Sequence, residues 1–469
     1  MRFSIENIGA IDSATVDIDG ITIIAGENNV GKSTIGKALF ATLRNMSDWK
    51  KIYDQVCIEA ISKFLYQNSV WLEDFCMVNS GAKRRRTSKT DLLIRQYASE
   101  EYFHVALEDY QLYIESAGSE GVAEALGGQL KNFCLDYLSL YFKKSKNELF
   151  SLYESDLSGW ISLTLKDSYR LNLDEVKLQR STISNSLRTV FQNQFRKFGT
   201  SKSSISFATN TRQIHFEVDD AGEYLDSPIY INNNIYFIES PKIYDYIANY
   251  KYGNNAKGNL RRMMIPNTFR SVASFDAGYH SGPTSANNID TELNPILDHL
   301  TDVMGGRAEF LQKTGLMFKD RVLDVPINSV NVSTGLKSIA LLEYALRIGA
   351  IERGDILVLD EPEINLHPEW QIEYARTIVA LQKHFDLKFI ITSHSPFFMR
   401  AIECFTDING TMDNLNVYRV SCSDRANTHE VINVSYSEYG MSDLYEDLSA
   451  PLGKLDELLN EKYGAEDGE

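Results

Sequence analysis

Hydrophobic and polar residues follow three successive patterns near the start of the chain. Phe3 and Ile5 alternate with polar neighbours, which is typical of a half-buried strand. The run Ile21–Ala25 is almost continuously apolar and predicts a central, buried strand. A glycine-rich loop follows, and residues 33–43 have the spacing of a helix. The first 45 residues therefore predict strand, turn, strand, loop and helix.

Residues 46–204 have a different pattern. They are rich in Leu, Tyr, Phe, Lys and Glu, and apolar side chains recur at helical intervals, as at Leu135, Leu138 and Tyr141. No apolar heptad continues over several repeats, which argues against a long coiled coil. We therefore expect a mostly helical insertion at 46–204.

Strand-like runs return after the insertion, and helices alternate with them from residue 293 onward. Residues 356–359 and 389–391 are continuously apolar and bounded by polar residues, as are strands covered on both faces of a parallel sheet. Further strands are expected at 204–208, 212–218, 235–239, 415–420 and 430–434, and a closing helix is expected at 442–459. The pattern predicts an α/β fold, with a head of residues 1–45 and 205–469 built on a mostly parallel core sheet.

Composition and charge exclude several classes of protein. Of the 469 residues, 43% are hydrophobic and 24% charged, which excludes a disordered or fibrous chain. The net charge of −17 argues against a globally basic coat for nucleic acid, but not against a local basic groove. Five scattered cysteines form no metal-binding pattern and are typical of reduced thiols. No secretory signal or membrane-spanning run is visible, so we expect a cytoplasmic protein outside the membrane.

Residues 26–33, GENNVGKS, match the phosphate-binding pattern G-x-x-x-x-G-K-[ST] between a predicted strand and a predicted helix. In such a loop, backbone N–H groups and the helix N-terminus converge on phosphate, and the glycines permit close approach. Lys32 is expected to reach the β- and γ-phosphates of ATP, and Ser33 to ligate Mg²⁺. The residues predicted to bind the nucleotide here are Gly26, Asn28, Asn29, Gly31, Lys32, Ser33 and Thr34.

Two adjacent acids, Asp360 and Glu361, follow the apolar run at 356–359. Asp360 is placed to hold Mg²⁺, directly or through water. Glu361 is placed to polarise the attacking water as a general base. A solvated strand end is the alternative, but the phosphate-binding loop in the same chain favours the metal and catalytic roles.

Ser333 and Gly335 begin a predicted helix upstream of the acidic pair. A Ser-x-Gly turn at a helix start presents backbone N–H groups to an anion, although an ordinary helix cap is the alternative. Within one chain this turn has no phosphate to bind, so we expect it to serve the γ-phosphate held by a second copy. His394, after the run at 389–391, is placed to donate a hydrogen bond to the same phosphate. Lys32, Glu361 and His394 are thus the predicted catalytic residues.

These four motifs, in this order, resemble those of the ABC-type ATPases of the SMC and RecF kind. Residues 363–368, EINLHP, are similar to the D-loop of the RecF and overcoming-lysogenization-defect branch rather than that of transporter cassettes. In this family two heads sandwich two ATP molecules with Mg²⁺. The resemblance implies that one chain supplies Lys32, Ser33, Asp360, Glu361 and His394 to each site, and the other chain supplies Ser333 and Gly335.

Two features depart from the family. The glutamine of its Q-loop has no clear counterpart, since Gln213 beside a predicted strand lies in a weak pattern. The related nucleases carry a Toprim domain after the head, but the stretch after His394 is too short for one and has no Asp-x-Asp cluster. This layout resembles the ATPase subunits of the Septu, retron and PARIS anti-phage systems. The resemblance implies an ATPase that controls a separate effector protein, such as a nuclease.

Other functions fit the same motifs. A RecF-like DNA-repair or DNA-structure-binding ATPase is one, and the basic cluster Lys83, Arg84, Arg85 and Arg86 is its candidate DNA contact. A solvated loop is the plain alternative for that cluster. A nucleotide-gated switch with negligible turnover would also keep this fold, whereas the D-loop and the large insertion argue against a transporter cassette.

Overall fold

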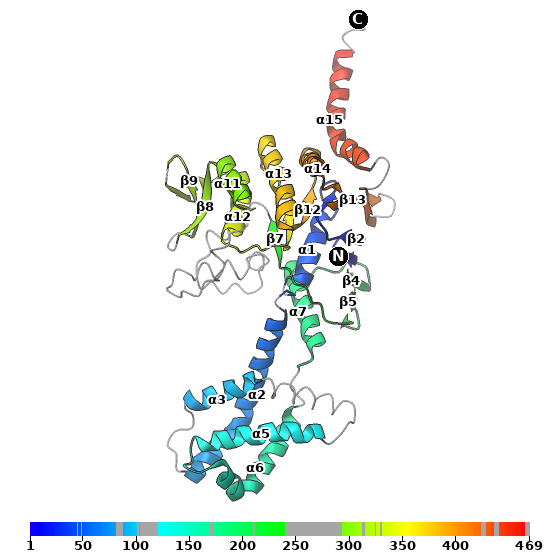
Figure 1. The fold of residues 1–469 in the computed structure, drawn as a ribbon. Helices are drawn as coiled ribbons and strands as arrows, with labels where there is room; N and C mark the ends of the chain where they lie inside the picture. Colours follow the sequence, from blue (N-terminus) through cyan, green and yellow to red (C-terminus); the bar gives the residue numbers. More distant parts are fainter. Residues whose placement is uncertain are drawn as a thin grey trace. The chain divides into compact units, whose positions relative to one another are not determined.

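The computed structural model divides the chain into two compact units (Figure 1). The head unit comprises Met1–Ser47 and Gln179–Glu469, and the insertion unit comprises Asp48–Leu178. The structure describes residues 1–44, 46–47, 49–80, 88–100, 103, 121–168, 173–209, 212–239, 293–311, 315–323, 325–328, 331–423, 428–435 and 440–464. The basic cluster at 83–86 lies outside the described residues.

An eleven-stranded sheet forms the centre of the head unit, in the order β6-β5-β4-β1-β2-β14-β13-β3-β12-β11-β7. Five neighbouring strands run parallel in the order β13 (Leu415–Ser423), β3 (Ile21–Ala25), β12 (Lys388–Ser393), β11 (Ile356–Asp360) and β7 (Ile235–Glu239). Every residue of β3 and nearly every residue of β11, β12 and β7 is buried, as their continuous apolar runs require. The predicted α/β fold with a parallel core is confirmed.

The other half of the same sheet consists of antiparallel strands. It consists of β1 (Arg2–Ile8), β2 (Ile11–Asp17), β4 (Lys202–Ala208), β5 (Gln213–Asp219) and β6 (Glu223–Leu225), joined to the parallel strands through β14 (Thr428–Asn433). Buried and exposed residues alternate along β2 and β5, because only one face packs on the core. Gln213 is an exposed residue at the start of β5, with five strands between β5 and β3. In the strand order, Gln213 therefore lies far from the strands that carry the phosphate-binding loop and the acidic pair.

Helix α1 (Lys32–Leu43) follows β3 and packs on the parallel strands. Gly36 permits this close approach, since a Cβ there would lie 2.7 Å from Cγ1 of Val358. Helices α13 (Pro368–Phe385) and α14 (Pro396–Ile408) follow β11 and β12, and each begins with a proline, whose missing N–H costs nothing at a helix start. Of the helices in the described part of the chain, none is long and apolar enough to cross a bilayer.

A second, three-stranded sheet was not predicted from the sequence. Strands β8 (Gly306–Leu311), β9 (Gly315–Asp320) and β10 (Pro326–Asn328) pair antiparallel, and β8 contacts the helices α11 (Leu293–Met304) and α12 (Thr334–Arg347). Helix α15 (Gly440–Gly464) includes the predicted closing helix at 442–459.

The insertion unit is helical in its described part, with a hydrophobic core of its own. Its longer helices are α2 (Trp49–Ser80), α3 (Ser88–Ser99), α5 (Gly121–Ser139) and α6 (Lys146–Ser168). The fully buried ring of Phe133 lies 5.3 Å from that of Tyr97 and 6.2 Å from that of Trp160, measured between centroids. Such aromatic packing gives the unit a core independent of the sheet.

The boundary between the units differs from the predicted one at residue 204. Helix α7 (Glu175–Val190) belongs to the head unit from Gln179 onward. The Gln179 side chain donates to the carbonyl of Ile229 at 2.8 Å and accepts from its N–H at 2.6 Å. Helical spacing shows which face of a helix is apolar, but it does not show which unit that face packs against.

Candidate active site

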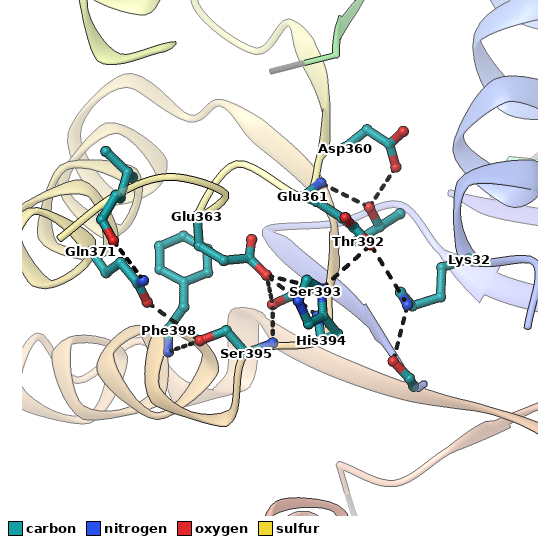
Figure 2. A network of polar contacts seen from close by, with 12 residues as sticks. Lys32, Asp360, Glu361, Glu363, Gln371, Thr392, Ser393, His394, Ser395 and Phe398 are labelled. Atoms are coloured by element: carbon teal, nitrogen blue, oxygen red, sulfur yellow. Dashed lines mark hydrogen bonds and ion pairs between the residues drawn. The ribbon is translucent and has the colours of Figure 1, made fainter. Parts of the chain in front are cut away.

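Apart from Ser333 and Gly335, the predicted site residues lie at or just after the carboxyl ends of β3, β12 and β11. Parallel strands in register bring these ends to one edge of the sheet, where ligands of open α/β sheets bind. Ala25 of β3 pairs with Ser393 of β12, and Thr392 pairs with Asp360 of β11. The segments that follow Ala25, Asp360 and Ser393 therefore meet, and Figure 2 shows Lys32, Glu361, Glu363 and His394 in one polar network.

The loop at 26–31 depends on residues that adopt positive φ. Gly31, directly before α1, has φ of 97°, and a Cβ there would lie 2.8 Å from Cδ1 of Ile11. Gly26 has φ of 156°, and its added Cβ would lie 2.7 Å from a backbone oxygen. Asn28 and Asn29 between them are exposed. The turn lies directly before the N-terminus of α1, where a phosphate-binding loop is expected.

Lys32 lies on the first turn of α1 and is only 4% exposed. Its Nζ donates to the carbonyl oxygens of Gly26 at 3.0 Å and Glu27 at 2.7 Å, and lies 3.8 Å from Oε1 of Glu361. Burial lowers the pKa of Lys32, and the nearby carboxylates, with Glu361 first, oppose that shift. The ammonium group is thus held against its own loop, beside the position where the loop would receive phosphate.

Ser33 and Asp360 lie side by side. The hydroxyl of Ser33 donates to Oδ1 of Asp360 at 2.7 Å, and the hydroxyl of Thr392 donates to the same oxygen at 2.7 Å. A serine hydroxyl next to a carboxylate offers the hard oxygen ligands that Mg²⁺ prefers, so these residues fit a magnesium ion shared with phosphate. Thr34 follows on the same turn of α1, where its N–H bonds to the carbonyl of Gly31 at 3.0 Å.

Glu361 has a strained backbone that another side chain holds in place. Its φ of 48° lies in the left-handed region, which a non-glycine residue seldom adopts. Its N–H donates to the carbonyl and the hydroxyl oxygens of Thr392, at 3.1 and 3.0 Å. In this conformation Oε1 of Glu361 lies 3.4 Å from Nδ1 of His394. The structure therefore brings Lys32, Glu361 and His394 together.

Three residues of this network were missed by the sequence reasoning. Thr392 bonds to Asp360 and Glu361, while Glu363 accepts from the hydroxyl of Ser393 at 2.6 Å. Burial raises the pKa of Glu363, which is only 4% exposed. Thr392 and Ser393 come at the end of a buried strand, and Glu363 lies in the D-loop-like segment. These positions are the features of the sequence that could have indicated a role for the three residues.

Ser333 and Gly335 lie at the start of α12. Ser333 is the exposed N-cap residue, and its side chain makes no capping hydrogen bond. A Cβ on Gly335 would lie 2.7 Å from the carbonyl oxygen of Asn365, in the loop after β11. Among the described residues, no hydrogen bond or ion pair joins these two positions to Lys32, Ser33, Asp360, Glu361 or His394.

Comparison with protein families gives one match. The family model described as "AAA ATPase domain" matches residues 1–399, a range that contains the phosphate-binding loop, the acidic pair, His394 and the insertion. No curated protein matches the sequence.

Solved structures with similar folds include heads of SMC proteins. The SMC head domain from Thermotoga maritima is 12% identical, with a TM-score of 0.34, and the alignment covers 92% of this chain and 98% of that one. An SMC head bound to the C-winged helix domain of ScpA is 12% identical, with a TM-score of 0.40 and coverage of 94% and 98%. A head from Pyrococcus furiosus, with an extended coiled coil and bound to the C-terminal domain of ScpA, is 10% identical, with a TM-score of 0.37 and coverage of 95% and 98%. Identities and scores at this level transfer no function to this chain.

Replacing Thr392 with valine tests the bridge between Asp360 and Glu361. The loss of a buried hydroxyl is expected to lower the free energy of unfolding by about 1–2 kcal/mol and to reduce ATP turnover, because the N–H of Glu361 loses one of its two acceptors. Urea unfolding and phosphate release measure the two effects. Thr22→Val is a matched control, since its equally buried hydroxyl bonds to the carbonyl of Asp17 on β2. Equal turnover in the two variants would contradict a role for Thr392 in the site.

Proposed function

The chain belongs to the AAA ATPase domain family, and from that premise we propose that it binds ATP with Mg²⁺ and hydrolyses ATP to ADP and phosphate. One observation carries the proposal. Oε1 of Glu361 lies 3.8 Å from Nζ of Lys32 and 3.4 Å from Nδ1 of His394, directly beside the contact between Ser33 and Asp360. A phosphate-binding loop, a candidate general base and a hydrogen-bond donor thus converge at one strand edge.

Different residues would bind the phosphates and the metal ion. The N–H groups of the loop and the N-terminus of α1 take the phosphate oxygens, and Lys32 turns from its own carbonyls to the β- and γ-phosphates. Ser33 and Asp360 hold Mg²⁺, which when bound neutralises charge on those phosphates. Asp360 accepts two hydrogen bonds at one oxygen, so its carboxylate is already oriented before ligand arrives.

Glu361 acts as the general base. Its carboxylate takes a proton from water while the water oxygen forms a bond to the γ-phosphorus, and the bond from that phosphorus to the oxygen of ADP breaks. Thr392 fixes the backbone of Glu361, so the carboxylate needs little reorganisation. His394 donates to the γ-phosphate and orients Glu361, which it already approaches.

Glu361→Gln is expected to lower the rate of hydrolysis by at least about 100-fold, because general bases contribute factors of that size. The amide keeps the shape of the side chain, so ATP should remain bound through gel filtration. Phosphate release and bound-nucleotide analysis measure both effects. Glu369→Gln, at an exposed glutamate on the first turn of α13, should change neither. Undiminished hydrolysis in Glu361→Gln would remove Glu361 from the role of base.

We further propose that two heads dimerise with ATP between them. Ser333 is exposed and its hydroxyl caps nothing, so it is available to a phosphate held by a second copy. The start of α12 also lies against the loop after β11, through the contact between Gly335 and Asn365. A nucleotide held by one head and contacted by the start of α12 of the other head would thereby lie next to the loop that carries Glu361 in that other head.

A mixing experiment tests the shared site. Lys32→Ala removes the phosphate-binding amine, and Ser333→Glu places a negative charge opposite the γ-phosphate, so each variant alone should have little turnover. In a mixed dimer, one site combines an intact Lys32 with an intact Ser333. The mixture should therefore recover turnover well above the sum of the separate variants, as measured by phosphate release. A purely additive rate would contradict sharing between chains.

The cellular role that we propose is the ATPase subunit of an anti-phage complex that controls a separate effector, such as a nuclease. The D-loop-like segment at 363–368 supports it. A tagged chain purified from its native gene neighbourhood should carry a stoichiometric second protein, released or retained according to ATP and Mg²⁺, and mass spectrometry identifies it. A lone chain that instead binds DNA would favour the RecF-like alternative, with Lys83, Arg84, Arg85 and Arg86 as the first contacts to replace.

A further inference from the structure

A buried carboxylate, Glu363, lies at the centre of the loop after β11 (Figure 2). Two residues with left-handed backbones flank it, Glu361 with φ of 48° and Asn365 with φ of 64°. Asparagine tolerates this region, but glutamate seldom adopts it, so at Glu361 the loop has a conformation that its sequence does not favour locally. Two hydrogen bonds within the loop, from Ile364 to Glu361 and from Leu366 to Glu363, support this conformation, and contacts with neighbouring segments add to them.

The contacts of Glu363 join the loop to a neighbouring segment. Its Oε1 accepts from the hydroxyl of Ser393 at 2.6 Å and from the N–H of His394 at 3.3 Å, and lies 3.9 Å from Nδ1 of His394. No lysine or arginine pairs with Glu363 among the described residues, and its Oε2 is buried without a hydrogen-bond partner. Burying a carboxylate so incompletely compensated costs stability, and burial accordingly raises its pKa. A group this costly is explained more readily by function than by stability.

A second set of hydrogen bonds closes a circuit around the same two loops. The N–H of Ser395 donates to Oγ of Ser393 at 3.1 Å, and the hydroxyl of Ser395 donates to Oε1 of Gln371 at 3.3 Å. The amide of Gln371 donates in turn to the carbonyl of Leu366 at 3.1 Å. The loop after β11 is thus tied to the end of β12 and the loop after it at two points, through Glu363 at its centre and through Leu366 near its end.

The far end of the loop contacts the start of α12. A Cβ on Gly335 would lie 2.7 Å from the carbonyl oxygen of Asn365 and 2.8 Å from Cδ2 of Leu366. Gly335 is therefore seated directly on the segment that Glu363 anchors. One short loop contacts the candidate base, the candidate phosphate-sensing histidine and the helix start proposed to serve a second copy.

We propose that Glu363 is a positioning residue for ATP hydrolysis. Through Ser393 and the N–H of His394, its carboxylate locks the loop after β11, so that Glu361 and His394 keep their mutual arrangement and Asn365 keeps its place against α12. This inference rests on the proposed ATPase function. It assigns Glu363 no contact with nucleotide, so its loss should affect the catalytic step and leave ATP binding by the loop at 26–33 intact.

Three variants test the proposal. Glu363→Ala removes both acceptor contacts and should lower kcat by about 10- to 100-fold, because small misplacements of catalytic groups cost factors of that size. ATP affinity, measured by fluorescence titration, should stay within about twofold. Glu363→Gln keeps an acceptor oxygen for Ser393 and His394, so its kcat should recover to within about fivefold of the wild-type value. Ser393→Ala removes one donor and keeps the carboxylate, so its kcat should be intermediate. This variant replaces Glu363→Ala in the test if Glu363→Ala does not fold.

Asp355→Asn is the matched control. Asp355 is likewise buried, accepts backbone N–H groups from Asn234 and Glu352 at 2.8 Å each, and directly precedes β11 at the end opposite the site. Its replacement can lower the unfolding temperature, but kcat per folded molecule should stay within about twofold.

The outcomes separate the two claims. A wild-type protein without turnover contradicts the proposed function. Wild-type turnover with an unchanged kcat in folded Glu363→Ala, or in Ser393→Ala if the former does not fold, overturns only the positioning role. Equal losses in Glu363→Ala and Glu363→Gln overturn it too, since charge and not hydrogen bonding would then matter. A fall in kcat with affinity retained, rescued by glutamine and absent from Asp355→Asn, supports it.

Discussion

The register between β11 and β12 positions the side chains that these two strands, and the loops after them, bring to the candidate site. Asp360 pairs with Thr392, so the hydroxyl of Thr392 reaches both the carboxylate of Asp360 and the N–H of Glu361. Because side chains alternate between the faces of a sheet, a slip of one residue would turn Thr392 away from both partners. The same register places Ser393 and His394 beside the loop after β11.

Charged groups in this site are buried before any ligand arrives. Lys32 and Glu363 are each 4% exposed, and each is held mainly by neutral partners, two carbonyls in one case and a hydroxyl and an N–H in the other. Such groups are costly in the folded chain, yet they need little solvent reorganisation when charge develops beside them. The strained φ of Glu361 has the same character. The buried apolar side chains of the central strands offset this local loss of stability.

The sequence indicated the parallel strands and the phosphate-binding loop because both are local signals. Residues 356–359 and Ile21–Ala25 are continuous apolar runs, and the glycine spacing of the loop is set by its backbone. Contacts between distant segments were not accessible in this way. The end of the insertion at Leu178 depends on Gln179 meeting Ile229, fifty positions away. The role of Glu363 depends on its hydrogen bond from Ser393, which only the fold brings close. The distance of Gln213 from the site strands in the sheet order was likewise visible only once β5 was placed in the sheet.

The proposed ATP-hydrolysing site is completed by a second copy of the chain. The most direct test of this arrangement is the rate of phosphate release per chain, measured with saturating ATP and Mg²⁺ over a wide range of protein concentrations. A site shared between two heads predicts a rate per chain that rises with concentration and then reaches a plateau, because dilution separates Ser333 and Gly335 from the nucleotide held by Lys32. A turnover rate independent of concentration down to the lowest measurable level would contradict the shared site, and no turnover at any concentration would contradict hydrolysis itself.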